Sequence, residues 1–234
     1  MISITSLETD KKYVVTLEEL IDVDFPLDEP FFLLVNHEGV KYEFIIRFAS
    51  DNQGLIAFGS GAYNPRKYNP PVFNRHSWIN DFKQSVLYYN DPTLYNDNII
   101  TLGWGVGRHD EWYLEVIARI IGSLTHLQGI KNQDILFFGS SGGGYTSIIL
   151  STILKGSAAL VNNPQIYLKK YRAGHWKNMV NACFPGLEDE IILEKYGYRF
   201  DVTEIFGREN HIPKITYLVN INSENDFQNQ LQPF

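Results

Sequence analysis

The chain has 234 residues, of which 44% are hydrophobic and 14% aromatic, and its 20 basic and 27 acidic side chains give a formal net charge of −7. This apolar content is enough for a large core, which excludes a disordered or fibrous protein. Without a basic excess, the sequence also has no electrostatic footprint for binding nucleic acid or anionic lipid.

Targeting and redox signals are sparse. The longest apolar run, residues 31–35, has five residues, whereas a membrane span needs about 20. The N-terminus has no basic or apolar signal region, so no secretory leader is predicted. Cys183 is the only cysteine, which excludes an internal disulfide and a cysteine-rich metal site. We therefore expect a cytoplasmic protein with no integral membrane segment, no metal and no cofactor.

Short β-rich runs alternate with longer helical runs, which predicts an α/β protein with a mostly parallel central sheet. The sequence shows no repeat, low-complexity tract or linker, so residues 1–234 are expected to form one domain, with residues 1–40 as an N-terminal β extension. The expected strands are residues 31–35, 42–48, 55–58, 85–89, 98–102, 134–138, 158–161 and 215–221. Residues 36–39 between the first two strands read as a hairpin turn.

The clearest helix begins at Glu111, because apolar residues then recur at three- and four-residue spacing. These residues are Tyr113, Ile117, Ile120, Ile121, Leu124 and Leu127. Asp110 is the expected N-cap of this helix and Gly129 the expected C′ residue. Further helices are expected over residues 142–155, 165–180 and 188–196.

One motif carries chemistry. Residues 139–143 read Gly-Ser-Ser-Gly-Gly and match the pattern G-x-S-x-G. The motif follows an apolar strand and opens a helix, which is the setting that a serine nucleophile turn requires. The glycines allow a sharp bend, so the hydroxyl of Ser141 would project above the sheet. The N–H of Gly142 would then face a developing oxyanion.

Two other interpretations of this glycine-rich turn stay open. One is a turn that serves only for packing, and the other is a turn that holds a phosphate. However, a phosphate loop needs Gly-Lys-Ser/Thr, and no lysine lies near the motif. A dinucleotide fingerprint would lie early in the chain, with an acidic residue about 20 positions further on. The position and the spacing therefore favour the nucleophile.

A second oxyanion donor normally comes from the loop after an earlier central strand. The strand at residues 55–58 is followed by Gly-Ser-Gly-Ala, so the N–H of Gly61 or Ala62 is the expected donor. The competing loop is the glycine-rich segment 103–107. There Trp104 either lines a pocket for an acyl group or sugar or belongs to the core.

A serine nucleophile also needs an acid and a histidine, which in proteins with this turn follow the serine in that order. Asp226 lies just past the last expected strand and is the predicted acid. Glu224 is its competitor, and a solvated loop charge is the alternative. None of the six histidines follows Asp226, and none is favoured as the base: they are His37, His76, His109, His126, His175 and His211. We therefore expect the chain to lack the last strand and helix of the fold, together with the base.

Several segments in order carry a resemblance to a known family: residues 55–62, 70–78, 89–94, 103–104 and 138–143. Over roughly residues 40–230 the chain resembles bacterial α/β-hydrolase-like proteins associated with capsule and surface-glycan assembly. More distantly it is similar to the acetyltransferase-like component of the accessory Sec system. The resemblance implies a three-layer α/β-hydrolase sandwich and a Ser/Asp/His triad, of which Ser141 and Asp226 are matched. Arg75, in the second segment, is expected to bind a substrate anion or to hold its loop through backbone carbonyls.

Three functions follow as hypotheses. The first is a serine esterase or acetyl-type acyltransferase acting on a glycan or small ester. The second is an inactive binding or scaffold protein in surface-glycan assembly, which the missing histidine favours. A peptidase of the same fold is the third. An unpaired edge near residues 215–221 would be covered by a homo-oligomer contact or by a partner chain.

Overall fold

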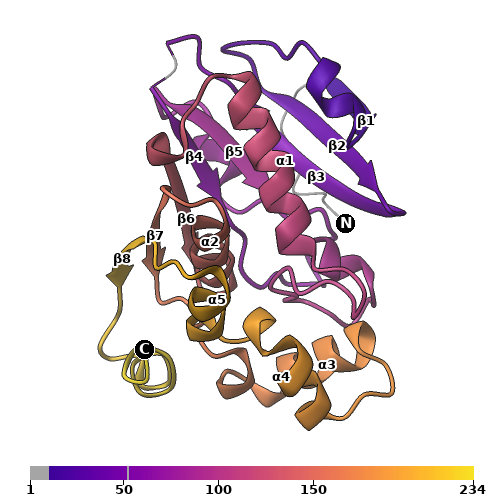
Figure 1. Cartoon of the computed structure of the whole chain (residues 1–234), viewed down its shortest axis with the longest axis vertical. Helices are drawn as coiled ribbons and strands as arrows, with labels where there is room; N and C mark the ends of the chain where they lie inside the picture. Colours follow the sequence, from indigo (N-terminus) through magenta and orange to yellow (C-terminus); the bar gives the residue numbers. More distant parts are fainter. Residues whose placement is uncertain (1–10, 52) are drawn as a thin grey trace.

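The strands form one eight-stranded sheet in the computed structural model, which describes residues 11–51 and 53–234 (Figure 1). The order across the sheet is β1-β2-β3-β5-β4-β6-β7-β8. The strands are β1 (Lys12–Thr16), β2 (Phe31–His37), β3 (Val40–Arg47), β4 (Leu55–Phe58), β5 (Ser85–Tyr89), β6 (Ile135–Ser140), β7 (Ala158–Asn162) and β8 (Lys214–Leu218). Strand β3 is antiparallel to both of its neighbours, and every other pairing is parallel. The sheet is therefore mostly parallel, as predicted.

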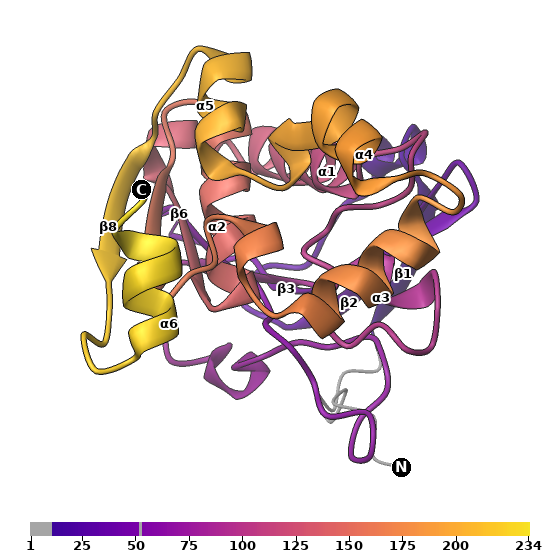
Figure 2. The same ribbon diagram turned by 90° about the horizontal axis from the view of Figure 1, so that it is seen from below.

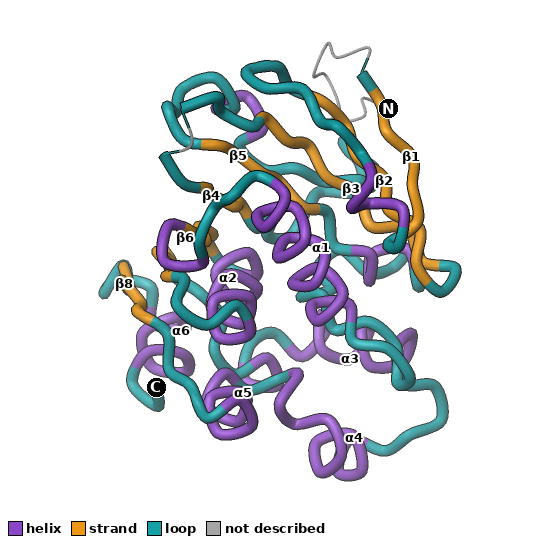
Figure 3. The backbone as a smooth tube through the Cα atoms, turned by 45° about the horizontal axis from the view of Figure 1, so that its top comes forward, coloured by secondary structure: helices purple, strands orange, loops and turns teal. Residues whose placement is uncertain are grey.

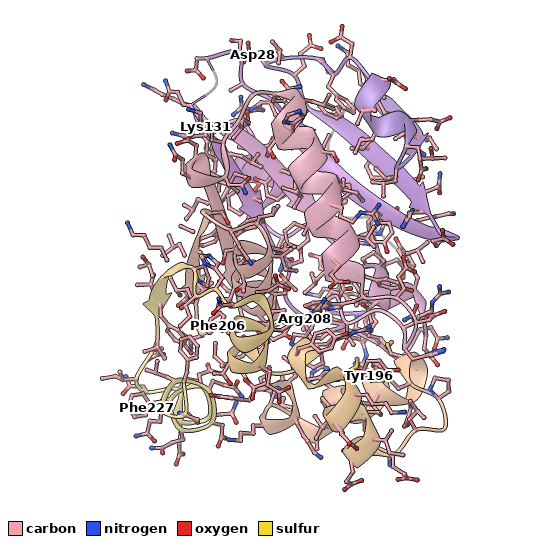
Figure 4. All side chains as sticks on the ribbon, viewed as in Figure 1. Asp28, Lys131, Tyr196, Phe206, Arg208 and Phe227 are labelled. Atoms are coloured by element: carbon pink, nitrogen blue, oxygen red, sulfur yellow. The ribbon has the colours of Figure 1, made fainter. Side chains whose placement is uncertain are left out.

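The helices of the described residues are α1 (Tyr113–Leu127), α2 (Gly142–Ile153), α3 (Ala173–Cys183), α4 (Asp189–Tyr196), α5 (Val202–Glu209) and α6 (Glu224–Asp226), which continues into a π-helical turn, Phe227–Leu231. Helices α1 and α2 cover one face of the sheet, and α5 packs on α2 (Figure 3). Helices α1 and α2 bury their apolar residues in the larger core cluster. Arg208 of α5 pairs with Glu115 of α1 and so links these two helices at the rim of the layer (Figure 4).

A thinner layer covers the opposite face. It is formed by the segment 59–84, which contains the 3-10 helix His76–Trp78 and buries Phe73 and Ile79 against strands β3, β4 and β5. Arg47 of β3 anchors this segment by donating hydrogen bonds to three backbone carbonyls, those of Ile79, Phe82 and Gln84. The layer on this face of the sheet is therefore mainly a loop that is held by hydrogen bonds from Arg47.

The strand predictions hold except at one segment. The expected strands 55–58 and 85–89 have these bounds in the structure, and the hairpin between β2 and β3 turns tightly at Glu38 and Gly39. Residues 98–102 form a loop, so the strand predicted there is wrong. The apolar pattern misled because Ile100 and Leu102 are buried in the core from a loop, where the N–H of Ile100 binds the carbonyl of Asp97.

Two helix predictions need correction. Helix α1 begins at Tyr113 rather than at Glu111, and Asp110 does not cap it, because its carboxylate pairs with Arg108 at 3.3 Å. Gly129 has φ of +67° just past the helix end, as predicted for a C′ residue. Residues 165–172 do not form the first half of a helix, since the N–H groups of Ile166 and Tyr167 bind the side chain of Gln230 instead.

Helix α5 is not predicted from the sequence, and the two edge strands of the sheet are predicted only in part. A local signal for α5 existed: Asp201 accepts from the N–H of Thr203 and has an acidic residue three positions later, as in a capping box. At one edge, β1 pairs with β2 as an extra strand, while residues 1–10 of the expected β extension lie outside the described residues. At the other edge, β8 ends at Leu218, three residues earlier than expected. No helix in the described ranges is both long and apolar enough to cross a membrane.

The close approach of β6 to α2 makes a prediction about stability. A side chain at Gly139 would overlap the backbone of Gly143, whereas a side chain at Gly207 in α5 meets nothing within 4 Å. Gly139→Ala should therefore lower the free energy of unfolding by about 1–3 kcal/mol. Gly207→Ala, the matched control, should raise the free energy of unfolding by about 0.5–1 kcal/mol, because alanine has less conformational freedom than glycine in the unfolded chain. Urea unfolding measures both, and equal shifts would contradict this packing.

Candidate functional site

Ser141 stands at the sharp bend between β6 and α2. Its backbone has φ of 56° and ψ of −126°, an uncommon and strained conformation for a residue with a side chain. The bend is held on both sides, since the N–H of Ser141 binds the carbonyl of Asn162 in β7 and its own carbonyl accepts from Gly144. Ser141 is half-buried, so its side chain lies at the surface of the core and not within packed hydrocarbon.

The loop after β4 packs directly against this bend. A side chain at Gly59 would lie 2.7 Å from the carbonyl oxygen of Gly143, and one at Gly61 would lie 3.6 Å from the Cβ of Ser141. The N–H groups of Gly61 and Gly142 have no hydrogen-bond partner among the described residues. Ala62, the alternative donor, is exposed. The geometry thus favours Gly61 and Gly142 as the pair of free donors beside Ser141.

A buried glutamine contacts the serine hydroxyl. The Nε2 of Gln165 donates to the Oγ of Ser141 at 2.8 Å, and its Oε1 accepts from the indole N–H of Trp104 at 3.1 Å. Both Gln165 and Trp104 are 1% exposed. Because an indole nitrogen can only donate, the carbonyl end of the amide faces Trp104 and the NH₂ end faces Ser141. The hydroxyl oxygen therefore accepts this bond, and its own proton stays available.

Trp104 is held in place by the loop that follows β5. The carboxylate of Asp91 accepts from the N–H of Gly105 at 2.9 Å, and Thr93 accepts from Gly107 at 3.1 Å. Burial raises the pKa of Asp91 above its ordinary value, against the lowering effect of these hydrogen bonds. Trp104 itself is buried and has φ of +54°. Its indole is linked to the serine hydroxyl through the side chain of Gln165.

Asp226, like Ser141, follows the carboxyl end of a parallel strand. It lies in the short helix α6 beside β8 (Figure 2). One carboxylate oxygen, Oδ2, accepts from the side chains of Asn163 and Ser223, both at 2.7 Å. Asn163 lies two residues before Gln165, so Asp226 supports the same segment that reaches Ser141. Its other oxygen, Oδ1, has no hydrogen bond within the described part of the chain. Glu224, the competing acid, is exposed.

No histidine of the described residues is hydrogen-bonded to Ser141 or Asp226. His175 of α3 is linked to Ser141 through Trp104 and Gln165. Its ring is edge-on to that of Trp104, with centroids 6.3 Å apart. Burial lowers the pKa of His175 from its ordinary value, and the charge of Arg172 lowers it further. The imidazole of His175 is therefore neutral near pH 7.

Arg75 comes from the layer that covers the opposite face. Its Nη2 donates to the Oγ of Ser140, the residue before Ser141, at 2.9 Å. Of the residues singled out from the sequence, the structure thus gathers Ser141, Gly142, Gly61 and Arg75 at the bend, with Trp104 behind them. The residue that sequence reasoning missed is Gln165. A signal for it existed in the polar run Asn-Asn-Pro-Gln, which follows the strand next to the serine strand.

Solved structures share this fold at low sequence identity. The capsule O-acetyltransferase of Neisseria meningitidis serogroup A, a mutant in complex with CoA, has a TM-score of 0.55 and 15% identity, covering 82% of this chain and 91% of that one. An S-formylglutathione hydrolase from Agrobacterium tumefaciens has a TM-score of 0.57 and 10% identity, covering 90% and 82%. The Glycosylation Associate Protein (Gap123) complex from Streptococcus agalactiae has a TM-score of 0.51 and 15% identity, covering 79% of this chain and 35% of that chain. No protein-family model and no curated protein matches the sequence.

The chain therefore has an α/β-hydrolase fold. Strands β2 to β8 follow the strand order of that fold, with the second of them antiparallel, and β1 is an added edge strand. The expected likeness to proteins of capsule and accessory Sec assembly is found at the level of the fold. At 10–15% identity these comparisons establish the architecture alone.

The link from Gln165 to Trp104 can be tested without any substrate. Gln165→Leu strands a buried indole donor and should lower the free energy of unfolding by about 1–3 kcal/mol. Adding Trp104→Phe removes that donor, so the double variant should lose less than the sum of the two single variants. Two-dimensional NMR of Gln165→Leu should show a shifted Trp104 indole resonance and an unchanged Trp176, whose indole binds Asp189 at 3.0 Å. Additive losses would contradict the contact.

Proposed function

We propose that this chain transfers acyl groups through a serine nucleophile, as an esterase or an acetyl-type acyltransferase. The observation that carries the proposal is the strained conformation of Ser141 between β6 and α2, next to two backbone N–H groups that bind no other described residue. Such strain is retained where the surrounding structure fixes it, and it concentrates at reactive sites. Free donors beside a hydroxyl form the arrangement that stabilises a tetrahedral oxyanion.

In the proposed reaction, the Oγ of Ser141 attacks the ester carbonyl carbon and forms the acyl–serine bond. The N–H groups of Gly142 and Gly61 donate hydrogen bonds to the negative oxygen, and each lowers the activation barrier by on the order of 3 kcal/mol. The serine proton passes to a base, which returns it to the leaving alcohol as the original ester bond breaks. Water or an acceptor hydroxyl then attacks the acyl–serine, and the released proton restores the hydroxyl. Gln165 keeps the serine oxygen oriented throughout.

The base in this proposal is a histidine oriented by Asp226. The Oδ1 of Asp226, which makes no hydrogen bond with another described residue, supports this role, because an orienting carboxylate needs an oxygen that can accept from an imidazole N–H. All six histidines lie among the described residues, and none is hydrogen-bonded to Ser141 or Asp226, so we infer that the base is supplied from outside this chain segment. His175 is the internal rival, since it reaches Trp104.

A second candidate function is a binding or scaffold protein that has this turn without catalysis. The contact between Gln165 and Ser141 favours it, because an amide cannot take the proton of the hydroxyl. Two structural neighbours, a capsule O-acetyltransferase and a Glycosylation Associate Protein complex, support a glycan as the ligand in either case. The predicted cytoplasmic location is part of both proposals.

Labelling by a fluorophosphonate probe separates the two functions. We expect slow labelling of the wild-type chain, because no described residue supplies the base, and complete loss of the label in Ser141→Ala. His175→Gln should keep the wild-type rate, because the proposed base lies elsewhere. A serine-to-alanine change at Ser147, which is fully buried in α2 and binds the carbonyl of Gly143, serves as the control. Equal labelling of wild type and Ser141→Ala would refute the nucleophile. An unlabelled, folded wild type would favour the scaffold.

A partner chain at the β8 edge belongs to the same proposal. Strand β8 ends the sheet in the described structure, and Ile212 and Leu218 are 71% and 49% exposed there. An open parallel edge with apolar side chains favours pairing with another chain. We expect light scattering to show self-association of the purified chain and Leu218→Lys to reduce it. Val14→Lys at the opposite edge, where Val14 is 56% exposed, should have no effect. A wild type that remains monomeric at high concentration would contradict the idea.

A further inference from the structure

Arg75 is a half-buried arginine whose hydrogen-bonding capacity is mostly unused. Its guanidinium lies over the rings of Trp78 and Phe138, 5.7 and 5.1 Å from their centroids. A guanidinium has five N–H donors, and the one hydrogen bond that the guanidinium of Arg75 makes within the described residues goes to Ser140. No described carboxylate pairs with it. Burial lowers the pKa of this guanidinium, as expected where no anion compensates for the lost hydration.

Two other buried arginines show the contrast. Arg47 donates from Nε and Nη2 to three backbone carbonyls at 2.6–2.8 Å. Arg199 donates from Nη1 to the carbonyl of Arg108 at 2.6 Å. Each of these side chains pins a loop. No described carbonyl accepts from Arg75, so the loop-holding role expected as an alternative for it has no contact to support it.

The backbone of Arg75 is fixed in place by its neighbours. Arg75 has φ of +66°, a left-handed conformation that a residue with a side chain rarely adopts. The residues before it are pinned from two strand ends: Ser60 Oγ accepts from Asn74 and donates to Val72, and Asn90 accepts from the N–H of Val72. The strain and these bonds place the guanidinium beside the Ser140–Ser141 step and leave little freedom for it to move away.

We propose that Arg75 binds an oxyanion of the substrate, a carboxylate or a phosphate group, next to the acyl group that Ser141 attacks. The planar guanidinium fork matches both groups with two parallel hydrogen bonds. A local cation is needed because the chain as a whole carries a charge of −7 and repels anions. The position of the reacting group rests on the proposed function, whereas anion binding at Arg75 does not. The substrate would then be an acidic ester or an acidic glycan.

The first test measures binding without catalysis. The Ser141→Ala chain is titrated calorimetrically with inorganic phosphate and with succinate at constant ionic strength. Arg75→Met, which keeps an apolar stem between the two rings, should weaken binding of the preferred anion at least tenfold. Arg66→Met, in the exposed loop before it, should not change the affinity. The anion that binds more tightly identifies whether the substrate group is a phosphate or a carboxylate. Undetectable binding of both, or equal affinities in the two methionine variants, would overturn the proposal.

A second variant and a kinetic measurement complete the test. Should Arg75→Met fail to fold, Arg75→Lys keeps the charge without the planar fork and should still weaken binding severalfold. With Ser141 intact, the succinate half-ester of 4-nitrophenol and acetyl phosphate carry the two anions, and 4-nitrophenyl acetate is the neutral control. Arg75→Met should raise KM for the preferred anionic substrate at least tenfold more than it raises KM for 4-nitrophenyl acetate. If no variant cleaves any of the three substrates, the chain alone lacks the proposed activity, while the calorimetric result still decides the anion site.

Discussion

The conformation of Ser141 depends on how closely two backbone segments approach each other. Strand β6 and helix α2 meet at a bend that has glycines on both sides. A third segment, the glycine-containing loop after β4, packs against this bend. A Cβ at Gly59, Gly139 or Gly143 would overlap backbone atoms of the facing segment. The strained φ of Ser141 is therefore maintained by packing, since any relaxation would have to push these three segments apart.

Around this bend, contacts converge from loops that are distant in sequence. The carboxylate of Asp91 positions Gly105, Trp104 orients Gln165, and Gln165 binds the hydroxyl of Ser141. A second route runs from Asn90 to the backbone of Val72 and onward to Arg75. Both routes begin in the segment directly after β5. The Asn-Asp-Pro-Thr-Leu run that carries part of the family resemblance therefore acts as a support, holding site residues without touching the reacting hydroxyl itself.

Local patterns predicted much of the fold. The hairpin between β2 and β3, strands β4 and β5, the serine turn and most of α1, α2 and α4 are visible in periodicity and turn chemistry. The failures share a cause. Residues 98–102 look like a strand because they are apolar, yet their burial comes from a loop packing on the core. Residues 165–172 look helical, but the backbone there bonds to Gln230 and Phe200, far along the chain.

The same division applies to the site. The serine turn and its flanking glycines were readable because a strand, a bend and a helix start are consecutive in the chain. The partners of Ser141 were not, because Gln165, Trp104 and the pair Gly61 and Arg75 come from three separate loops that meet only when parallel strands align their carboxyl ends. A single sequence records which polar residues end each strand. Their distances, and the fact that an amide rather than an imidazole contacts the hydroxyl, follow from packing across the sheet, which local sequence does not encode.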